Sequence, residues 1–234
     1  MQPCDVRCLG LIPYQQAWDL QAQLARQIAT GELPPTLLLL EHPHTYTFGR
    51  RGQATNLLWS DEELKQRSVQ VYWVDRGGDV TYHGPGQLVG YPLISLKSSG
   101  MTTSTQNDTT ILPQADYVGY LRRLEQVIIQ ALQQFGVNAG RIQNLTGVWV
   151  NGAKIAAIGV KVDSYGVTRH GFALNVAPDM TYWNGIIGCG LAGYSVTSLA
   201  NLLPEPPTMH QVIAAVIAAF EDVFETTCQV TCPE

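Results

Sequence analysis

The chain of 234 residues lacks any apolar run long enough to cross a membrane. Its clearest apolar stretch, Val212 to Phe220, covers only nine residues, whereas a membrane-spanning helix needs about 20. The N-terminal stretch Met1 to Arg7 also lacks the basic region followed by an apolar run that marks a secretory signal. We therefore expect a cytoplasmic protein that has no membrane partner.

Cysteine is scarce, and its spacing is unhelpful for cross-linking or zinc binding. The count is odd, with no Cys-x-x-Cys pair, which argues against a disulfide framework and against a zinc site. His42 and His44 flank a proline without a third ligand nearby, so we expect loop structure there and no metal. Apart from one cysteine discussed below, we expect surface or packing thiols at Cys4, Cys8, Cys228 and Cys232.

Two further absences narrow the function. The chain has neither a Gly-x-x-x-x-Gly-Lys-Ser/Thr phosphate loop nor a clear acidic magnesium cluster, so we predict no cofactor. The net charge of −5 argues against nucleic acid as a partner, because nucleic-acid binding depends on Lys and Arg neutralising phosphates. With 45% hydrophobic residues and no low-complexity or charged linker, residues 1–234 are predicted to form a single domain.

The hydrophobic pattern mixes both kinds of secondary structure. Helical spacing of apolar residues predicts helices over Tyr14–Thr30 and Pro113–Phe135, each followed by glycine. Thr208 and Gln211 resemble a capping box that opens a third helix ending near Phe224. This mixture favours an α+β fold with a mixed sheet. Strands are expected at Leu37–Leu40, Val69–Val74, Gln87–Ile94, Val148–Val150, Lys154–Val162 and Phe172–Val176.

The stretch Arg76 to Gln87 combines four glycines and a proline within twelve residues, a poor composition for a strand or a helix. Glycine pairs let main-chain N–H groups approach a ligand carbonyl or phosphate, while Arg76, Tyr82 and His83 can orient it. A tight loop between two strands is the alternative, because glycine-rich loops are common.

A lysine follows a predicted turn later in the chain. Asn151-Gly152 between two β-prone runs favours a type I′ hairpin, so Lys154 opens the second strand. The two-residue period then places Lys154 on the same face as the apolar residues Ala156, Ile158 and Val160. A lysine that snorkels at a strand end is the alternative interpretation.

Cys189 lies between two glycines in a turn that is expected to lead into a short helix near Ser195. Inert core cysteines usually lie among Val, Leu and Ile, so this setting favours an exposed, reactive thiol. A thiol with a pKa near 8.5 is only about 3% ionised at pH 7, so a reactive site must stabilise the thiolate. Lys154 is the candidate, since an ammonium about 4 Å from the sulfur contributes roughly 4 kcal/mol at an effective dielectric constant near 20.

Taken together, these motifs resemble the lipoyl(octanoyl) transferase family, the octanoyl-[acyl carrier protein]:protein N-octanoyltransferases. The resemblance extends over most of the chain and differs at Gly188, where the family usually has proline. It implies the catalytic fold of biotin and lipoate protein ligases. The matching segments are Glu41-His42-Pro43, Thr45–Arg50, Arg76–Gln87, Lys154–Gly159, His170–Asn175, Cys189-Gly190 and Val196–Leu199.

The resemblance also implies a two-step acyl transfer. Cys189 would take an octanoyl group from octanoyl-acyl carrier protein as a thioester, and Lys154 would serve as general base when an acceptor lysine attacks. The implied acceptors are lipoyl domains of 2-oxoacid dehydrogenase E2 subunits and the glycine cleavage H protein. The implied acyl site is the backbone of Arg76, Gly77, Gly78, Asp79, Val80, Thr81, Tyr82 and His83, of Ala157, Ile158 and Gly159, and of Gly171, Phe172 and Ala173.

Two other functions stay open. An ATP-dependent lipoate or biotin ligase could use the same glycine-rich loop and lysine but would not need the cysteine. A non-catalytic acyl-binding module would hold octanoate without turnover. The polar stretch Ser98 to Thr110 receives no role, and an acidic carrier protein would need a local basic patch for docking. Candidate patches are Arg50-Arg51, Lys65 with Arg67, and Arg122-Arg123.

Overall fold

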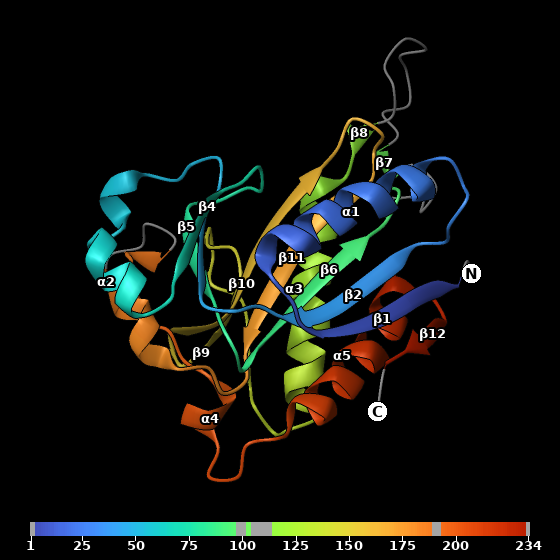
Figure 1. Ribbon diagram of the computed structural model, residues 1–234. Coiled ribbons are helices and arrows are strands. Elements are labelled where there is room, and N and C mark those ends of the chain that lie inside the picture. Colours follow the sequence, from blue (N-terminus) through green and yellow to red (C-terminus); the bar gives the residue numbers. More distant parts are fainter. Residues whose placement is uncertain (1–2, 97–101, 104–113, 189–192, 233–234) are drawn as a thin grey trace.

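A computed structural model describes residues 3–96, 102–103, 114–188 and 193–232 (Figure 1). Within that part of the chain, seven strands form the main sheet. Strand β1 runs parallel to both of its neighbours, while the other pairs are antiparallel, so the sheet is mixed. The spatial order is β12 (Cys228–Thr231), β1 (Cys4–Leu11), β2 (Thr36–Glu41), β6 (Gln87–Leu93), β11 (Thr168–Asn175), β10 (Ala153–Val162) and β9 (Val148–Val150).

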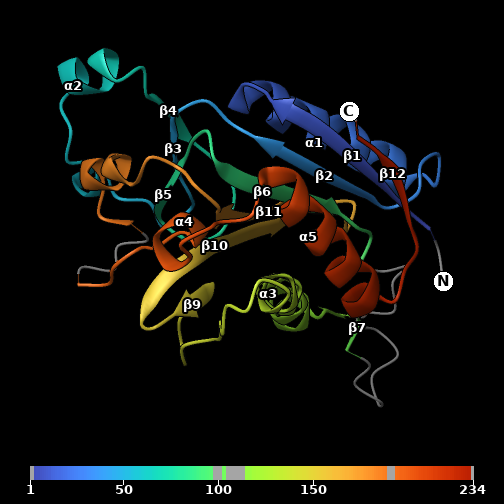
Figure 2. The same ribbon diagram turned by 90° about the horizontal axis from the view of Figure 1, so that it is seen from below.

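Long helices cover the two faces of this sheet. Helix α1 (Tyr14–Ala29) packs on one face, and α3 (Tyr117–Gln133) and α5 (Met209–Phe224) lie side by side on the other (Figure 2). The continuous leucine run of β2 suits this arrangement, because successive side chains of a strand point to opposite faces. Leu37 and Leu39 join the cluster under α3 and α5, while Leu38 and Leu40 join the cluster under α1.

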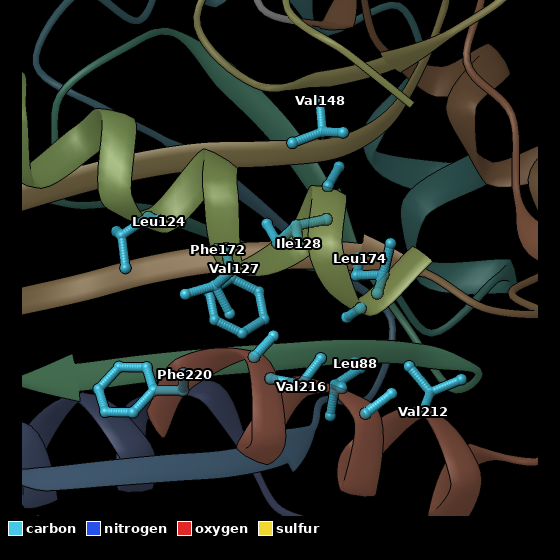
Figure 3. Packing of buried hydrophobic residues seen from close by; sticks show 14 of the residues in the cluster. Leu88, Leu124, Val127, Ile128, Val148, Phe172, Leu174, Val212, Val216 and Phe220 are labelled. Carbon is cyan, nitrogen blue, oxygen red and sulfur yellow. The ribbon is translucent and has the colours of Figure 1, made fainter. Parts of the chain in front are cut away.

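The larger core lies between the sheet and the α3–α5 pair. Figure 3 shows Leu88 of β6 and Phe172 of β11 close to Val127 of α3 and Val216 of α5. Phe172 lies opposite Gly90, where an added Cβ would come within 2.1 Å of the phenyl ring. Gly90 therefore leaves the space that this aromatic side chain fills.

A second, smaller sheet stands beside the first. Its order is β4 (Gln70–Trp73), β3 (Thr45–Phe48) and β5 (Val80–His83), and α2 (Asp61–Gln66) lies beside it (Figure 1). The remaining elements are β7 (Thr102–Thr103), β8 (Gln114–Ala115), the 3-10 helices η1 (Ala54–Asn56) and η2 (Met180–Gly185), and α4 (Leu199–Leu202).

The structure confirms the predicted α+β class and the three long helices. Thr208 and Gln211 form the capping box of α5, which ends at Phe224. Asn151 and Gly152 both have positive φ, of 50° and 81°, as a type I′ turn requires. The six predicted strands are present; Val148–Val150 has the predicted ends, and the other five have shifted ends.

Several local predictions were wrong or incomplete. The segment Arg76–Gln87 is not loop throughout, because Val80–His83 forms strand β5, whose pairing with β3 outweighs the glycine-rich composition. The helix expected near Ser195 begins only at Leu199, where the Ser198 side chain accepts a hydrogen bond from Asn201 N. The pattern did not reveal β1, β3, β12, α2, or the short pair β7 and β8.

The prediction that all four peripheral cysteines are unpaired was also wrong. Cys8 and Cys232 form a disulfide across 224 residues of sequence. Strands β1 and β12 pair in parallel with Cys4 opposite Cys228, so the equal spacing of four residues brings Cys8 next to Cys232. Sequence spacing alone could not show this, since the two strands come from opposite ends of the chain.

Candidate active site

A cavity of about 570 Å³ opens where the loop before β5 meets β10 and β11. This volume lies within the usual range for small-molecule sites. Twelve of the fourteen predicted acyl-site residues line it, together with Lys154. These are Arg76, Gly77, Gly78, Asp79, Thr81, His83, Ala157, Ile158, Gly159, Gly171, Phe172 and Ala173.

Val80 and Tyr82 do not line the cavity. Both are fully buried in a separate cluster around the small sheet, together with Tyr46 and Phe48. The reason is the strand period: in β5, Thr81 and His83 face the cavity while their neighbours face away. The sequence prediction had treated the whole stretch as a backbone-lined loop.

Arg76 anchors the glycine-rich loop to the small sheet. Its Nη2 donates to Thr47 Oγ1 at 2.9 Å, and its Nη1 donates to Gly77 O at 2.9 Å. The Gly77 N–H donates to Val160 O of β10 at 3.0 Å. The loop is therefore held between the two sheets, and the Arg76 side chain links the loop to strand β3.

Two glycines at the cavity leave little or no room for a side chain. A Cβ on Gly171 would lie 2.1 Å from Gly90 O, and one on Gly159 would lie 3.0 Å from Arg76 Cδ and from Gly77 O. These close approaches explain why a glycine stands at each position of the β10–β11 pair, Gly159 opposite Gly171.

Two buried histidines, His83 at the cavity and His42 behind it, are held neutral. His83 Nδ1 is 2.9 Å from Gln87 Oε1 and donates to it, and burial keeps the pKa of His83 well below its ordinary value. His42 lies beside it, with ring centroids 5.7 Å apart, and burial lowers its pKa to about 4. Its Nδ1 donates to Ile12 O and its Nε2 accepts from the Tyr91 hydroxyl, both at 2.8 Å. Both rings serve as hydrogen-bonding partners, and neither carries charge at neutral pH.

His170 makes a structural hydrogen bond. Its Nε2 lies 2.7 Å from Asp75 Oδ1, and Asp75 also pairs with Lys161. The bond to His170, the largest cause, and the Lys161 ammonium hold the pKa of Asp75 far below its usual range, while burial lowers that of His170. The backbone of His170 has φ of 58°, and its N–H donates to Gln21 Oε1 at 2.7 Å.

The simple two-residue period predicted that Lys154 and Ala156 share a face of the strand, but the pairing with β9 differs from that prediction. The register between β10 and β9 shifts between these two residues, so Lys154 pairs with Trp149 while Ala156 pairs with Val148. This bulge at Ile155 separates Lys154 from Ala156 in the pairing with β9, while Lys154, Ile158 and Val160 line the same cavity. The side chain is only 6% exposed, and its Nζ lies 4.8 Å from the centroid of the Trp149 ring.

Cys189 lies outside the described residues, but the segments that flank it adjoin Lys154. The backbone of Lys154 donates to Ser195 O and accepts from Thr197 N, both at 2.9 Å. Gly188 and Tyr194 line a small hollow together with Lys154. The chain therefore approaches Lys154 immediately before residue 189 and runs alongside it again from residue 195.

A buried polar chain connects the glycine-rich loop to this segment. Gln87 accepts from His83 and donates through Nε2 to Asn175 Oδ1 at 2.8 Å. Asn175 donates through Nδ2 to Thr197 O at 2.9 Å, and Thr197 N donates to Lys154 O. Because buried amides are costly to leave unpaired, this chain fixes the two motifs relative to each other.

Sequence reasoning missed a second group of cavity residues. Most of them belong to segments without glycine-rich or catalytic signatures, while Val160 and His170 lie in segments that the sequence analysis had singled out; only the fold brings them all together. They are Tyr14, Arg51, Gln53, Asn56, Tyr91, Leu121, Asn144, Leu145, Thr146, Val160 and His170.

Among the residues that the structure describes, no three His, Cys, Asp or Glu side chains gather as a metal site would require. The same part contains no helix with the length and hydropathy needed to span a membrane.

Comparison with known proteins agrees with this geometry. Residues 13–221 match the model of the lipoyl protein ligase A/B catalytic domain. An octanoyltransferase of Rubrobacter xylanophilus is 46% identical over 94% of this chain and 93% of its own. A bipartite lipoate protein ligase of Thermoplasma acidophilum superposes with a TM-score of 0.74 at 14% identity, covering 100% of this chain and 88% of that one. A biotin protein ligase of Aquifex aeolicus gives 0.51 at 10% identity, covering 96% and 70%.

The sheet, its helices and the cavity thus define a catalytic domain of the biotin and lipoate protein ligase fold. Within that fold, the chain belongs to the octanoyltransferase family and is an acyltransferase of the lipoyl(octanoyl) transferase class. The predicted fold and family are both confirmed.

Proposed function

We propose that this enzyme moves an octanoyl group from octanoyl-acyl carrier protein to a lysine of a lipoyl domain, through a thioester on Cys189. The Cys189 thiolate attacks the thioester carbonyl of the donor, the carbon–sulfur bond to the carrier breaks, and the carrier leaves as a thiol. The acceptor amine then attacks the new thioester, an amide forms, and the sulfur of Cys189 leaves. Each step forms one bond to the acyl carbon and breaks one, so the scheme needs neither ATP nor a cofactor.

Lys154 is assigned two roles in this scheme. As an ammonium it stabilises the Cys189 thiolate and then gives its proton to the departing carrier thiolate, and as the neutral amine that remains it accepts the proton that the attacking amine must lose. The observation that supports the scheme most directly is the shared hollow of Lys154 and Gly188, the residue next to Cys189. The burial of Lys154 against Trp149 strengthens its electrostatic effect.

The acyl chain is assigned to the 570 Å³ cavity. In this proposal it contacts the backbone of the segments 76–83, 157–159 and 171–173, while residues 1–234 act as one catalytic domain. Burying about six methylenes contributes up to roughly 5 kcal/mol, which retains the chain but discriminates weakly between neighbouring lengths.

The acceptors are proposed to be the lipoyl domains of 2-oxoacid dehydrogenase E2 subunits and the glycine cleavage H protein. The lipoate protein ligase of Thermoplasma acidophilum supports this class of partner, since it was solved as part of a lipoylation system with its E2 lipoyl domain. For the acidic carrier protein, the proposed docking patches are Arg50-Arg51, Lys65 with Arg67, and Arg122-Arg123.

The test is octanoyl transfer to an apo lipoyl domain, followed by intact-mass analysis. With octanoyl-acyl carrier protein and no ATP, we expect the acceptor to gain one octanoyl group, and Cys189→Ser to abolish the gain. Modification that requires ATP and free octanoate, and that survives Cys189→Ser, would contradict the proposal and identify a ligase. Binding of octanoate without transfer under either condition would identify an acyl-binding module.

A further inference from the structure

Glu125 is a buried acid that the scheme above leaves without a role. It lies on α3 next to Leu124 in the apolar core, and its side chain is only 1% exposed. A carboxylate in such a place is costly unless it is paired and hydrogen-bonded. Its partners therefore show what the position is used for.

Three donors surround the carboxylate. Oε2 accepts from Arg122 Nη1 at 2.7 Å and from Arg141 Nε at 2.8 Å, and Oε1 accepts from the backbone N–H of Gly147 at 3.2 Å. Two more hydrogen bonds fix the Arg141 side chain, since its Nη2 donates to Arg122 O at 2.9 Å and to Gln126 Oε1 at 3.1 Å. Two of the three donors thus come from one loop outside α3.

This loop comprises residues 141–147, and Glu125 binds both of its ends. Gly140 and Trp149 exchange two backbone hydrogen bonds of 2.8 and 2.9 Å, which close the base of the loop. Arg141 is the first loop residue and Gly147 is the last. The carboxylate therefore fixes the loop onto α3 where it leaves the base and where it returns.

The 141–147 loop forms one wall of the acyl cavity. Asn144, Leu145 and Thr146 line the cavity, as does Leu121 of α3. The end of the loop also lies beside the lysine: a Cβ built on Gly147 would lie 3.4 Å from Lys154 Cε and 2.6 Å from Ala156 O. Gly147, with φ of 121°, thus carries no side chain on the side where the Lys154 stem lies.

We propose that Glu125 is a positioning residue that seats the 141–147 loop as a wall of the acyl cavity and as a support for Lys154. The inference rests on the proposed function for its effect on transfer, but the clamp itself can be measured without substrate. A glutamine at this position has the same shape but carries no charge, and its amide N–H₂ would replace one of the two acceptor oxygens. It would leave at least one of the three donors without its partner.

The first test is amide hydrogen exchange of the 141–147 loop in the full chain, without substrate. We expect Glu125→Gln to raise the exchange rate at Gly147 by roughly tenfold or more. Glu205→Gln makes the same chemical change at an exposed position and serves as the matched control. If Glu125→Gln does not fold, Arg141→Met is measured in its place, because it removes one contact to the Glu125 carboxylate from a side chain that is 35% exposed. Faster exchange of the loop amides is expected in this variant too.

The second test is steady-state transfer with hexanoyl, octanoyl and decanoyl carrier protein. A displaced wall and a loosened lysine should lower kcat with octanoyl by roughly 10- to 100-fold and shift the ratio of kcat/KM between chain lengths. Unchanged exchange at Gly147, or an unchanged chain-length ratio in a folded variant with loosened loop amides, would overturn the proposal. If the unmodified protein transferred no octanoyl group, the proposed function would be refuted. The hydrogen-exchange result would then still show whether Glu125 holds the 141–147 loop.

Discussion

The burial of His42 makes the stability of this protein sensitive to mild acid. Burial lowers the pKa of His42 to about 4 in the folded protein, from 6.5 for an exposed histidine. Between these two values the unfolded chain binds a proton that the folded chain does not. Stability is therefore fully present above pH 6.5 and is lost as the pH falls toward 4.

The size of this loss follows from the same two values. Each pH unit between them corresponds to about 1.36 kcal/mol. Protonation of His42 in the unfolded chain should therefore lower the free energy of unfolding by about 3 kcal/mol near pH 4, relative to neutral pH. Burial lowers the pKa of His83 and His170 as well, so the total acid sensitivity exceeds the share of His42. A comparison of variants isolates that share.

The assay is urea unfolding of the unmodified protein and of His42→Gln between pH 7.5 and pH 4.5. At pH 7.5 the variant should be less stable, because the bonds to Ile12 and Tyr91 are weakened. The difference between the two proteins should shrink by about 2 to 3 kcal/mol at pH 4.5. His210→Gln, at an exposed position of α5, is the control. A difference for His42→Gln that stays constant with pH would refute the reasoning.

Three further outcomes are expected. Cys8→Ser should lower the melting temperature by roughly 10 °C, because the Cys8–Cys232 bond restricts the unfolded chain and so stabilises the fold by up to about 5 kcal/mol. Calorimetry with and without reductant checks this, and a melting temperature of the unmodified protein that does not change with reductant would contradict it. Asn175→Leu should cost about 1 to 3 kcal/mol, since Gln87 loses its partner, and should slow transfer through the segment beside Lys154; equal stability in urea would count against the polar chain. Lys154→Met should keep the fold, as judged by circular dichroism, and reduce transfer at least 100-fold; near-normal turnover would exclude its role.

Much of the fold could be predicted because local signals and the final structure agree. The α5 capping box, the Asn151-Gly152 turn and the leucine run of β2 each specify their own conformation. The short strands β3 and β5 could not be predicted, because their burial comes from pairing with each other and from the cluster around Tyr46.

The site divides in a similar way. The family resemblance located twelve of the cavity residues, but it could not show which side of β5 faces the cavity. The bulge at Ile155, which turns Lys154 toward Trp149, depends on pairing with β9. Glu125 and the 141–147 loop have no motif at all, and only the packing of α3 against the loop reveals them.

The central claim is that the acyl group resides on the sulfur of Cys189 during transfer. The most direct measurement is rapid-quench intact-mass analysis after mixing the enzyme with octanoyl-acyl carrier protein, with peptide mapping to separate Cys189 from the free thiols of Cys4 and Cys228. We predict one octanoyl group on the peptide that contains Cys189, formed within a single turnover and released when an apo lipoyl domain is added. Transfer to the acceptor without any acylated form of Cys189 would contradict the account.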